Sequence, residues 1–211
     1  MTEEMIAFLI QHNRKRSYAP GEIIFSQGDT AEAFFYLLDG LSLTYTIFPD
    51  GRERNILVSW PRQLFGASTF FEGVPRRASA IAVKPCDILA VDAAAYRLCC
   101  SRFPTFRDEI IRELSRDIGV LFEELADSSL MSAELRVAQF LCRRLTRRQY
   151  SGPADRPQLR FTQSFIASVL GISRVSVGHA ISALVRRGWV ETTYGGLVIV
   201  DVAALRSYAY G

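Results

Sequence analysis

Two stretches of the chain hold residues whose types and spacing point to binding, and the first is LFGASTFFEGVPRRASA at 64–80. Gly66 after an apolar pair, a short helix-like stretch and then two adjacent arginines would suit a bound anion. A pocket for a sugar phosphate would also need an acid near the glycine, to take the sugar hydroxyl, and that place holds Ala67. The stretch predicts an anion pocket without this acid. The alternative is a filled core with Arg76 and Arg77 in solvent.

The second stretch, FTQSFIASVLGISRVSVGHAISALVRRGWV at 161–190, has the apolar spacing of two short helices. Gly171 ends the first helix, and Ser173 is a good N-cap for the second. Two short helices joined by a tight turn that contains glycine predict a helix-turn-helix. The β-rich runs on either side of Gly195 and Gly196 predict a hairpin that forms a wing. An ordinary αα-hairpin packed on a β-hairpin is the alternative.

A helix-turn-helix places its second helix in the major groove, where residues near the start of that helix reach base edges. Arg174 can donate two hydrogen bonds to guanine, and Ser176 is short enough for a base or a phosphate. Polar residues at the start of the first helix suit phosphate contacts, which position the protein without specifying sequence. The predicted DNA contacts are Thr162, Gln163, Ser164, Ser173, Arg174, Val175, Ser176 and His179.

The distribution of charge supports a nucleic-acid-binding module at one end of the chain. The net charge is +3, but residues 131–211 hold 11 arginines and 4 acidic residues, while residues 1–130 hold 14 basic and 18 acidic ones. A basic C-terminal third joined to a mildly acidic remainder is typical of a DNA-binding region attached to another domain. We therefore expect double-stranded DNA as a partner.

The elements that must position these residues follow from a change of period along the chain. From 18 to 92, short runs rich in Ile, Val, Phe, Tyr and Thr alternate with turn signals such as Pro20-Gly21. Asp39-Gly40, between two such runs, is a strong hairpin signal. This spacing predicts an antiparallel sandwich or barrel.

From 104 onward the period is helical. Apolar residues at alternating spacings of three and four predict the a/d seam of a coiled coil, and therefore dimerisation. The alternative is a single helix that lies on the barrel. Ile110 and Phe122 lie off the seam and are placed to face the barrel. The predicted dimerisation residues are Ile111, Leu114, Ile118, Leu121 and Leu125.

In order and spacing, these motifs resemble the Crp–Fnr family of bacterial transcription regulators over nearly the whole chain. The matching pieces are PGEIIFSQGD, YLLDG, PDGRE, the FG before the phosphate-binding arm, the long helix and GISRVSVGHAISALVRRGWV. The resemblance implies an α+β fold in three regions. These are an antiparallel β-roll of the cyclic-nucleotide-binding type at 1–105, a dimerisation helix at 106–130 and a winged helix-turn-helix at 131–211. It also implies a homodimer that binds a pseudo-palindromic operator, works with RNA polymerase and responds to an effector in the roll.

Departures from the family pattern bear on the effector. Cyclic-AMP-binding members have a glutamate after the FG glycine and end the arm in Arg-Ser-Ala. Counting from Gly66, Ala67 takes the place of the glutamate, and Arg77-Ala78-Ser79 takes the place of Arg-Ser-Ala. We therefore expect a small organic or aromatic anion instead of cyclic AMP. The halorespiration regulators of this family, which bind chlorinated phenols, are similar in lacking these cyclic-nucleotide-binding residues. The predicted effector contacts are Gly66, Ala67, Ser68, Phe70, Phe71, Arg77, Ala78, Leu121, Phe122 and Leu125.

A second departure bears on the DNA sequence. Many family members have Ser-Arg-Glu-Thr where residues 173–176 are Ser-Arg-Val-Ser. A glutamate accepts a hydrogen bond from cytosine, whereas the methyls of Val175 can pack on a thymine methyl. The resemblance thus predicts A·T where relatives with glutamate read G·C.

Other function classes have little support in the residues. No nucleophile–base pair, phosphate loop or metal-ligand spacing is present, so we expect neither an enzyme nor a metal site, and no cofactor beyond an unknown effector. The four cysteines predict idle or buried thiols. The acids before the first short apolar stretch, and the absence of a long apolar run, predict a cytoplasmic protein without a membrane partner. A constitutive regulator with an empty sensor domain and a haem-based gas sensor remain as alternatives.

Overall fold

The computed structural model describes residues 1–127, 131–146 and 156–211, and the chain divides into two compact units, Met1–Phe122 and Glu123–Gly211. Side chains are described in these ranges except at 123–127 and 146. The sequence YSGPADRP at 150–157 also predicts a loop, but most of these residues lie outside the described ranges. The predicted regions 1–105, 106–130 and 131–211 remain a prediction, because the compact units divide the chain inside the long helix.

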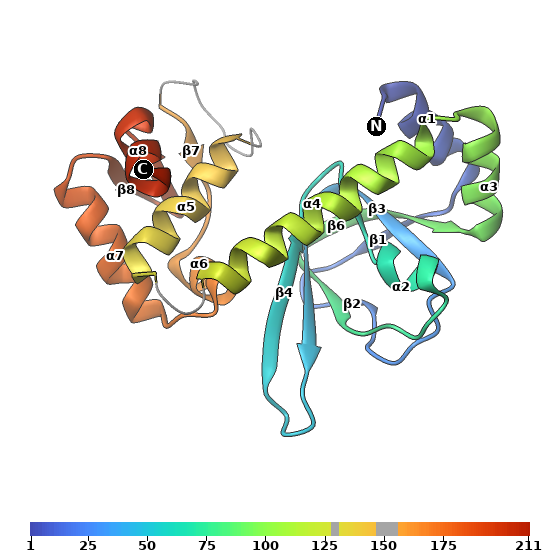
Figure 1. Cartoon of the computed structure of the whole chain (residues 1–211), viewed down its shortest axis with the longest axis horizontal. Coiled ribbons are helices and arrows are strands. Elements are labelled where there is room, and N and C mark those ends of the chain that lie inside the picture. Colours follow the sequence, from blue (N-terminus) through green and yellow to red (C-terminus); the bar gives the residue numbers. More distant parts are fainter. Residues whose placement is uncertain (128–130, 147–155) are drawn as a thin grey trace. The chain divides into compact units, whose positions relative to one another are not determined.

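The first unit is an antiparallel β-roll, and the helices that precede and follow its strands in the chain pack together (Figure 1). Its main sheet has the strand order β1-β6-β3-β4, with β2 paired to β6 and β5 paired to β3. This arrangement confirms the predicted fold class for the N-terminal half. The elements are α1 (Glu3–His12), β1 (Lys15–Tyr18), β2 (Ile23–Phe25), β3 (Ala33–Ile47), β4 (Glu53–Ser59), β5 (Leu64–Phe65), α2 (Ala67–Glu72), β6 (Ser79–Asp92), α3 (Ala93–Arg102) and α4 (Phe106–Asp127).

One predicted turn of the roll is wrong. Asp39-Gly40 does not end a strand, because β3 runs through it and the pairing with β6 only shifts register there. Gly40 has φ +100°, and a Cβ on it would lie 2.1 Å from the carbonyl oxygen of Pro85. A glycine is needed here because the backbone is left-handed and the facing strand is too close for a side chain. The Asp-Gly signal therefore marks a bulge.

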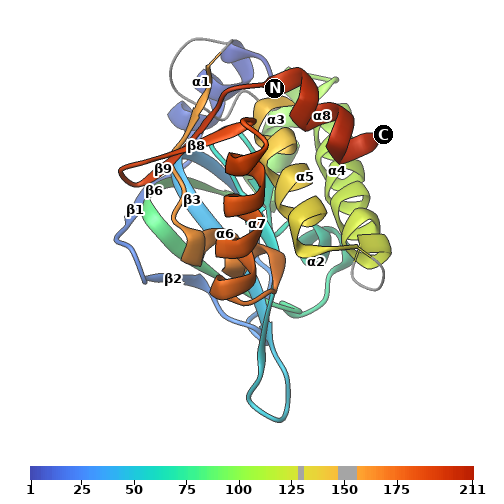
Figure 2. The ribbon, with the colours of Figure 1, turned by 90° about the vertical axis from the view of Figure 1, so that its left-hand side faces the viewer.

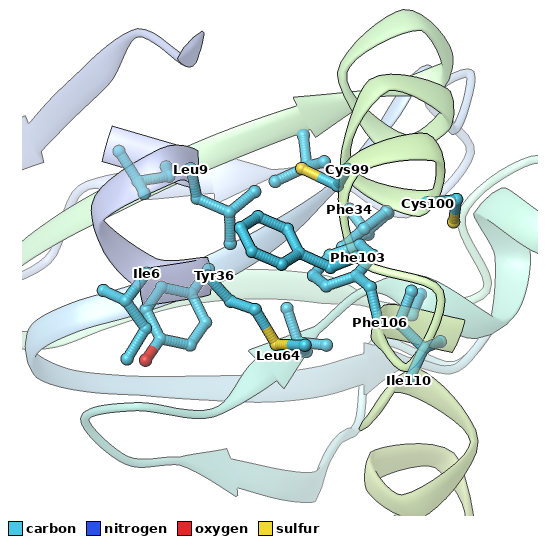
Figure 3. Packing of buried hydrophobic residues seen from close by; sticks show 14 residues of the cluster. Ile6, Leu9, Phe34, Tyr36, Leu64, Cys99, Cys100, Phe103, Phe106 and Ile110 are labelled. Atoms are coloured by element: carbon cyan, nitrogen blue, oxygen red, sulfur yellow. The ribbon is translucent and has the colours of Figure 1, made fainter. Parts of the chain in front are cut away.

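Two groups of buried side chains hold the roll together. One lies among α1, α3, the start of α4 and β3, where Figure 3 shows Leu9, Phe34, Tyr36, Phe103 and Phe106 packed together. The other is built on the inner strands and contains Phe35, Leu37, Phe65, Ala80, Ala82, Cys86 and Ile88. Neither α1 nor α3 followed from the sequence, because both helices are short and their packing partners are distant in the chain.

Helix α4 has a buried side and an exposed apolar stripe. Phe106 and Ile110 are 0% and 4% exposed and belong to the core beside α1 and α3. Ile111, Ile118 and Phe122 are 60%, 54% and 69% exposed. The expectation that Phe122 faces the barrel is therefore wrong, since the side chain lies on the same exposed stripe as the two isoleucines.

The second unit is a winged helix-turn-helix, as predicted from its period and turn residues. Its elements are α5 (Ala133–Thr146), β7 (Gln158–Leu159), α6 (Gln163–Leu170), α7 (Arg174–Arg186), β8 (Val190–Thr193), β9 (Gly196–Ile199) and α8 (Val202–Tyr210). Helix α5 packs against both α7 and α8, and Figure 2 shows α5, α6 and α7 side by side. Strands β7, β9 and β8 form a small antiparallel sheet in that order.

Among the described residues, no single helix is long and apolar enough to cross a membrane. The pair α6 and α7 passes that test only when taken together, and the two helices are bent by 112° at their junction.

Candidate DNA-binding surface and effector pocket

The turn between α6 and α7 fixes how the second helix begins. Gly171 ends α6 in the left-handed conformation, with φ 61°. Ser173 then caps α7, because its Oγ accepts a hydrogen bond of 3.0 Å from the backbone N–H of Ser176. The angle of 112° between the helices falls within the range typical of a helix-turn-helix. The N-terminal turn of α7 is thereby fixed in place by local interactions.

One face of α7 is exposed and carries no acidic residue. Arg174, His179 and Ser182 are exposed on it, and Val175 is 66% exposed. The opposite face is buried in the unit, with Val177, Ile181 and Leu184 at 0–2% exposure. Within the described part of the chain, Arg174 makes no hydrogen bond or ion pair, so its guanidinium is available to a partner. The exposed surface of α7 therefore carries hydrogen-bond donors and two apolar side chains, Val175 and Val185.

Several of the predicted DNA contacts also cap helices. The hydroxyl of Thr162 accepts a hydrogen bond of 3.1 Å from the N–H of Phe165, and the hydroxyls of Ser173 and Ser176 are 2.8 Å apart. Ser164 is exposed, and Gln163 is half-buried at the start of α6. The structure thus places all eight predicted residues near the start of α6 or within the first two turns of α7, but three of their hydroxyls already have partners.

The wing contains a residue that sequence reasoning missed. Tyr194 stands at the turn between β8 and β9 and is 105% exposed, so its ring touches no other part of its own unit appreciably. Gly195, with φ +74°, follows it in the turn. An aromatic residue beside two glycines in a hairpin turn was the available signal.

In the roll, the buried cation is Arg76. Its side chain is 4% exposed and lies over the ring of Phe25, with the guanidinium carbon 4.4 Å from the ring centroid. It donates hydrogen bonds to the carbonyl of Gly66 at 2.6 Å, to the hydroxyl of Thr69 at 3.1 Å and to the carbonyl of Ala33. Its Nε is buried without a partner among the described residues. No carboxylate of the described chain is hydrogen-bonded to this guanidinium.

Burial lowers the pKa of the Arg76 guanidinium, and attraction to the nearby Asp29 carboxylate opposes this effect. Gly66 makes room for the arginine, because a Cβ at that position would lie 3.0 Å from its Nη1, and φ there is +69°. The rings of Phe25 and Phe35 stack on each other beside the guanidinium, and the ring of Phe65 stacks on Phe35. The interior of the roll therefore has an aromatic wall and one cation whose positive charge no hydrogen-bonded acid neutralises.

The expectation that Arg77 is the cation of the pocket is corrected by this geometry. Arg77 is exposed and forms a two-pronged ion pair with Glu72 on the surface of α2, with Nη2 to Oε1 at 2.5 Å. This pair raises the pKa of Arg77 and lowers that of Glu72. Counting from Gly66 was one residue off, and Arg76 points inward instead.

Comparison with known proteins agrees with both halves of this description. Residues 15–103 match the model of the cyclic nucleotide-binding domain, and residues 135–208 match that of the Crp-like helix-turn-helix domain. The two matches lie in the order that the motifs predicted. The chain belongs to the Crp/Fnr family of transcription regulators.

Relatives in this family resemble the chain over nearly its whole length. The cyclic AMP receptor protein of Thermus thermophilus is 28% identical over all of the chain and 95% of its own length. The CRP-like cAMP-activated global transcriptional regulator of Mycobacterium tuberculosis is 26% identical over 93% of the chain and 88% of its own length. The structure of FixK2 from Bradyrhizobium japonicum has the same fold, with a TM-score of 0.79, 20% identity and coverage of 94% and 98% of the two chains. The Crp/Fnr relatives are transcription regulators, and the chain is a regulator and not an enzyme.

The remaining effector residues predicted for this Crp/Fnr regulator differ in their surroundings, as far as the structure describes them. Ala67 is buried in the core beside α1 and α3, and Phe70 packs against the same core. Phe71 is 40% exposed, and Phe122 is 69% exposed on α4. Ser68 is exposed, Ala78 and Leu121 are half-buried, and the side chain of Leu125 lies outside the described residues. The role of these residues in effector binding stays a prediction.

The four cysteines of the regulator all lie in the described residues, where each is a buried thiol outside any disulfide bond. Burial raises the pKa of Cys99 and that of Cys142 to about 11. Neutral thiols at ordinary pH are poor nucleophiles and poor metal ligands. Among the described residues, no group of three or more His, Cys, Asp or Glu side chains is arranged to hold a metal ion.

Proposed function

We propose that the protein is a homodimeric, sequence-specific DNA-binding regulator that reads a two-fold-symmetric site with α7 in the major groove. The observation that carries this proposal is the exposed, acid-free face of α7, with Arg174 unpaired among the described residues. A guanidinium at the start of a recognition helix can donate two hydrogen bonds to O6 and N7 of guanine. The charge of residues 131–211, 11 arginines against 4 acids, favours approach to phosphates.

The exposed stripe of α4 supports a homodimer. Ile111, Ile118 and Phe122 are spaced seven and four residues apart, so they share one side of the helix. Three large apolar side chains exposed together on one helix are typical of an interface. Leu114 packs partly against the core of the roll, and Leu121 is half-buried, so both lie at the edge of this stripe. Two copies of α4 side by side would set the spacing of two recognition helices on a pseudo-palindromic operator.

The effector of this regulator is a small organic or aromatic anion held near Arg76. A buried guanidinium without a hydrogen-bonded carboxylate, beside the rings of Phe25 and Phe35, suits a carboxylate or phenolate with an apolar body. The side chain of Ala67 offers no acceptor for a sugar hydroxyl, so we do not expect cyclic AMP as the effector. This expectation differs from the name of the relative in Thermus thermophilus, a cyclic AMP receptor protein. Binding there would bias the arrangement of α4 and hence the affinity for DNA. The same proposal includes RNA polymerase as a partner of the regulator and the cytoplasm as its location.

A second candidate is a constitutive regulator whose sensor is filled by its own side chain. It is favoured by the three oxygens that Arg76 already contacts, those of Gly66, Thr69 and Ala33. In this case, the arginine is part of the core, and no ligand enters the roll.

One set of measurements separates these candidates. Native mass spectrometry of the protein purified from cells gives the subunit number and the mass of any retained molecule. Binding to an operator recovered by selection from random duplexes is then followed by fluorescence anisotropy while benzoate, phenolates or cyclic AMP are added. A dimer whose affinity for DNA changes at least fivefold with an aromatic anion, and not in Arg76→Gln, supports the effector proposal. A response to cyclic AMP alone overturns it, and no response to any ligand selects the constitutive regulator.

A further inference from the structure

Gly178 has no structural reason within the chain to be a glycine. It lies in the second turn of α7, its φ is not positive, and a Cβ there would meet only the Oε1 of Gln163, at 3.4 Å. That distance is an ordinary van der Waals contact. Apart from proline, glycine is the least favourable residue inside a helix. The missing side chain therefore weakens the helix without relieving any crowding inside the unit.

Gly178 borders Val175, the most exposed apolar side chain of α7. Val175 is three residues before Gly178, so the two positions are neighbours on the helix surface. Val175 is 66% exposed, and a β-branched side chain in a helix is held almost entirely in one χ1 rotamer. Its two methyls consequently stand in a fixed position beside a place where no side chain projects. Arg174 and His179 flank this place with polar groups.

We propose that Val175 and Gly178 form a notch that receives the 5-methyl group of one thymine in each half-site. The inference rests on the proposed function, since it requires α7 to lie in the major groove. Thymine alone presents a methyl group there, and an apolar contact with that methyl is a recognised mode of base readout. The absence of a Cβ at 178 lets the base edge approach the helix closely, and the valine methyls provide its apolar contact. Cytosine has no methyl group at this position and would place its N4 donor against the valine methyls, which cannot accept a hydrogen bond.

The experiment removes the methyl without changing the base pairing. The operator is first recovered by selection, and each thymidine of one half-site is then replaced by deoxyuridine, one at a time and symmetrically in both half-sites. We expect the replacement at one position to weaken binding about fourfold per half-site, the effect of one buried methyl group. All other replacements should leave the affinity within about twofold. Val175→Ala should remove most of the difference between thymidine and deoxyuridine at that position.

The Gly178→Ala variant separates this role from a structural one. Adding a Cβ fills the notch, so binding to the thymidine operator should fall at least fivefold, and deoxyuridine at the sensitive position should recover part of the loss. The thermal unfolding midpoint should rise, because alanine is a better helix former. Ser182→Ala on the same face also favours the helix but adds no atoms, so it is the matched control and should keep the sensitivity to the methyl.

The outcomes distinguish the inference from the function on which it rests. If selection recovers no preferred sequence, the proposed sequence-specific binding fails. If a site is recovered but no deoxyuridine replacement weakens binding of the unmodified protein, the notch is refuted while the DNA-binding function stands. A Gly178→Ala variant that binds normally would likewise overturn the notch, and one that melts at lower temperature would assign the glycine a role inside the unit.

Discussion

The two units place their candidate functional groups in opposite environments. In the winged helix-turn-helix, Arg174 and Val175 are exposed and take no part in the core of their unit. In the roll, Arg76 is 4% exposed and hydrogen-bonded to the chain on three sides. A binding group on the surface can be changed without cost to the fold, whereas a binding group inside the roll is also part of what holds the roll together. Function and stability are therefore separable in one unit and joined in the other.

The first unit also has an exposed candidate group, the apolar stripe of α4, and the largest effect is expected there. Ile118→Glu places a charge among apolar side chains at the proposed interface, so dimerisation should weaken by ~100-fold or more. Binding to the operator should fall with it, while the unfolding midpoint stays close to that of the unmodified protein. Sedimentation equilibrium and anisotropy measure the two effects.

Ile110, on the buried side of the same helix, gives the contrast. Ile110→Ala creates a cavity in the core, so it should lower the free energy of unfolding by about 2–4 kcal/mol and leave the subunit number unchanged. An Ile118→Glu protein that remains a dimer would show that the stripe is not the interface.

A smaller effect is expected at Arg174. Arg174→Ala removes the proposed pair of hydrogen bonds to guanine, and the affinity should fall roughly 5- to 150-fold per half-site. Because the side chain is exposed and unpaired among the described residues, chemical denaturation should be unchanged. Arg186→Ala removes the same charge from the last turn of α7 and should lower the affinity only slightly. Equal losses in both variants would mean that α7 contributes general electrostatic attraction and no base recognition.

In the roll, we expect the change to appear in stability. Arg76→Ala leaves the oxygens of Gly66, Thr69 and Ala33 without their donor and uncovers the ring of Phe25, so the free energy of unfolding should fall by about 2–4 kcal/mol. Arg77→Ala, which removes only a surface ion pair, should leave the denaturation curve unchanged. If the two variants behaved alike in urea denaturation, the assignment of the inward position to Arg76 would be wrong.

The smallest effect concerns the buried thiols. With pKa values raised to about 11, Cys99 and Cys142 stay protonated at pH 8, so iodoacetamide should label them far more slowly in the native protein than after unfolding. The unfolded chain releases these protons at lower pH than the folded one. Their contribution to stability therefore falls as the pH rises from ~8.5 towards 11. Mass spectrometry of labelled peptides measures each site, and rapid native labelling at pH 8 would contradict the burial.

What could be predicted from the sequence follows the same division. The helix-turn-helix was predictable because its signals are local. Gly171 and Ser173 fix the turn, and the helical spacing of the apolar residues shows which of them are buried. In the roll, the inward arginine and the bulge at Gly40 depend on the pairing of strands that are distant in the sequence. Arg76 and Arg77 lie in the segment between α2 and β6, where no periodic pattern in the sequence tells which of two adjacent arginines is buried. The direction of Phe122 was misjudged because periodicity alone does not say which side of α4 is covered.

The long pairing of β3 with β6 also has a consequence for the order in which the chain is made and folded. Ala33 pairs with Asp92 and Tyr45 with Ser79, so the pairing of β3 with β6 is complete only after the whole of β6 has left the ribosome. Until then, the inner apolar residues of β3, such as Phe35, have the two-residue strand β5 beside them but lack the longer neighbour β6. The helices of the second unit close over much shorter stretches of chain, and local contacts form faster than distant ones. The sensor region, although synthesised first, is therefore the part of this regulator most exposed to aggregation during its own synthesis.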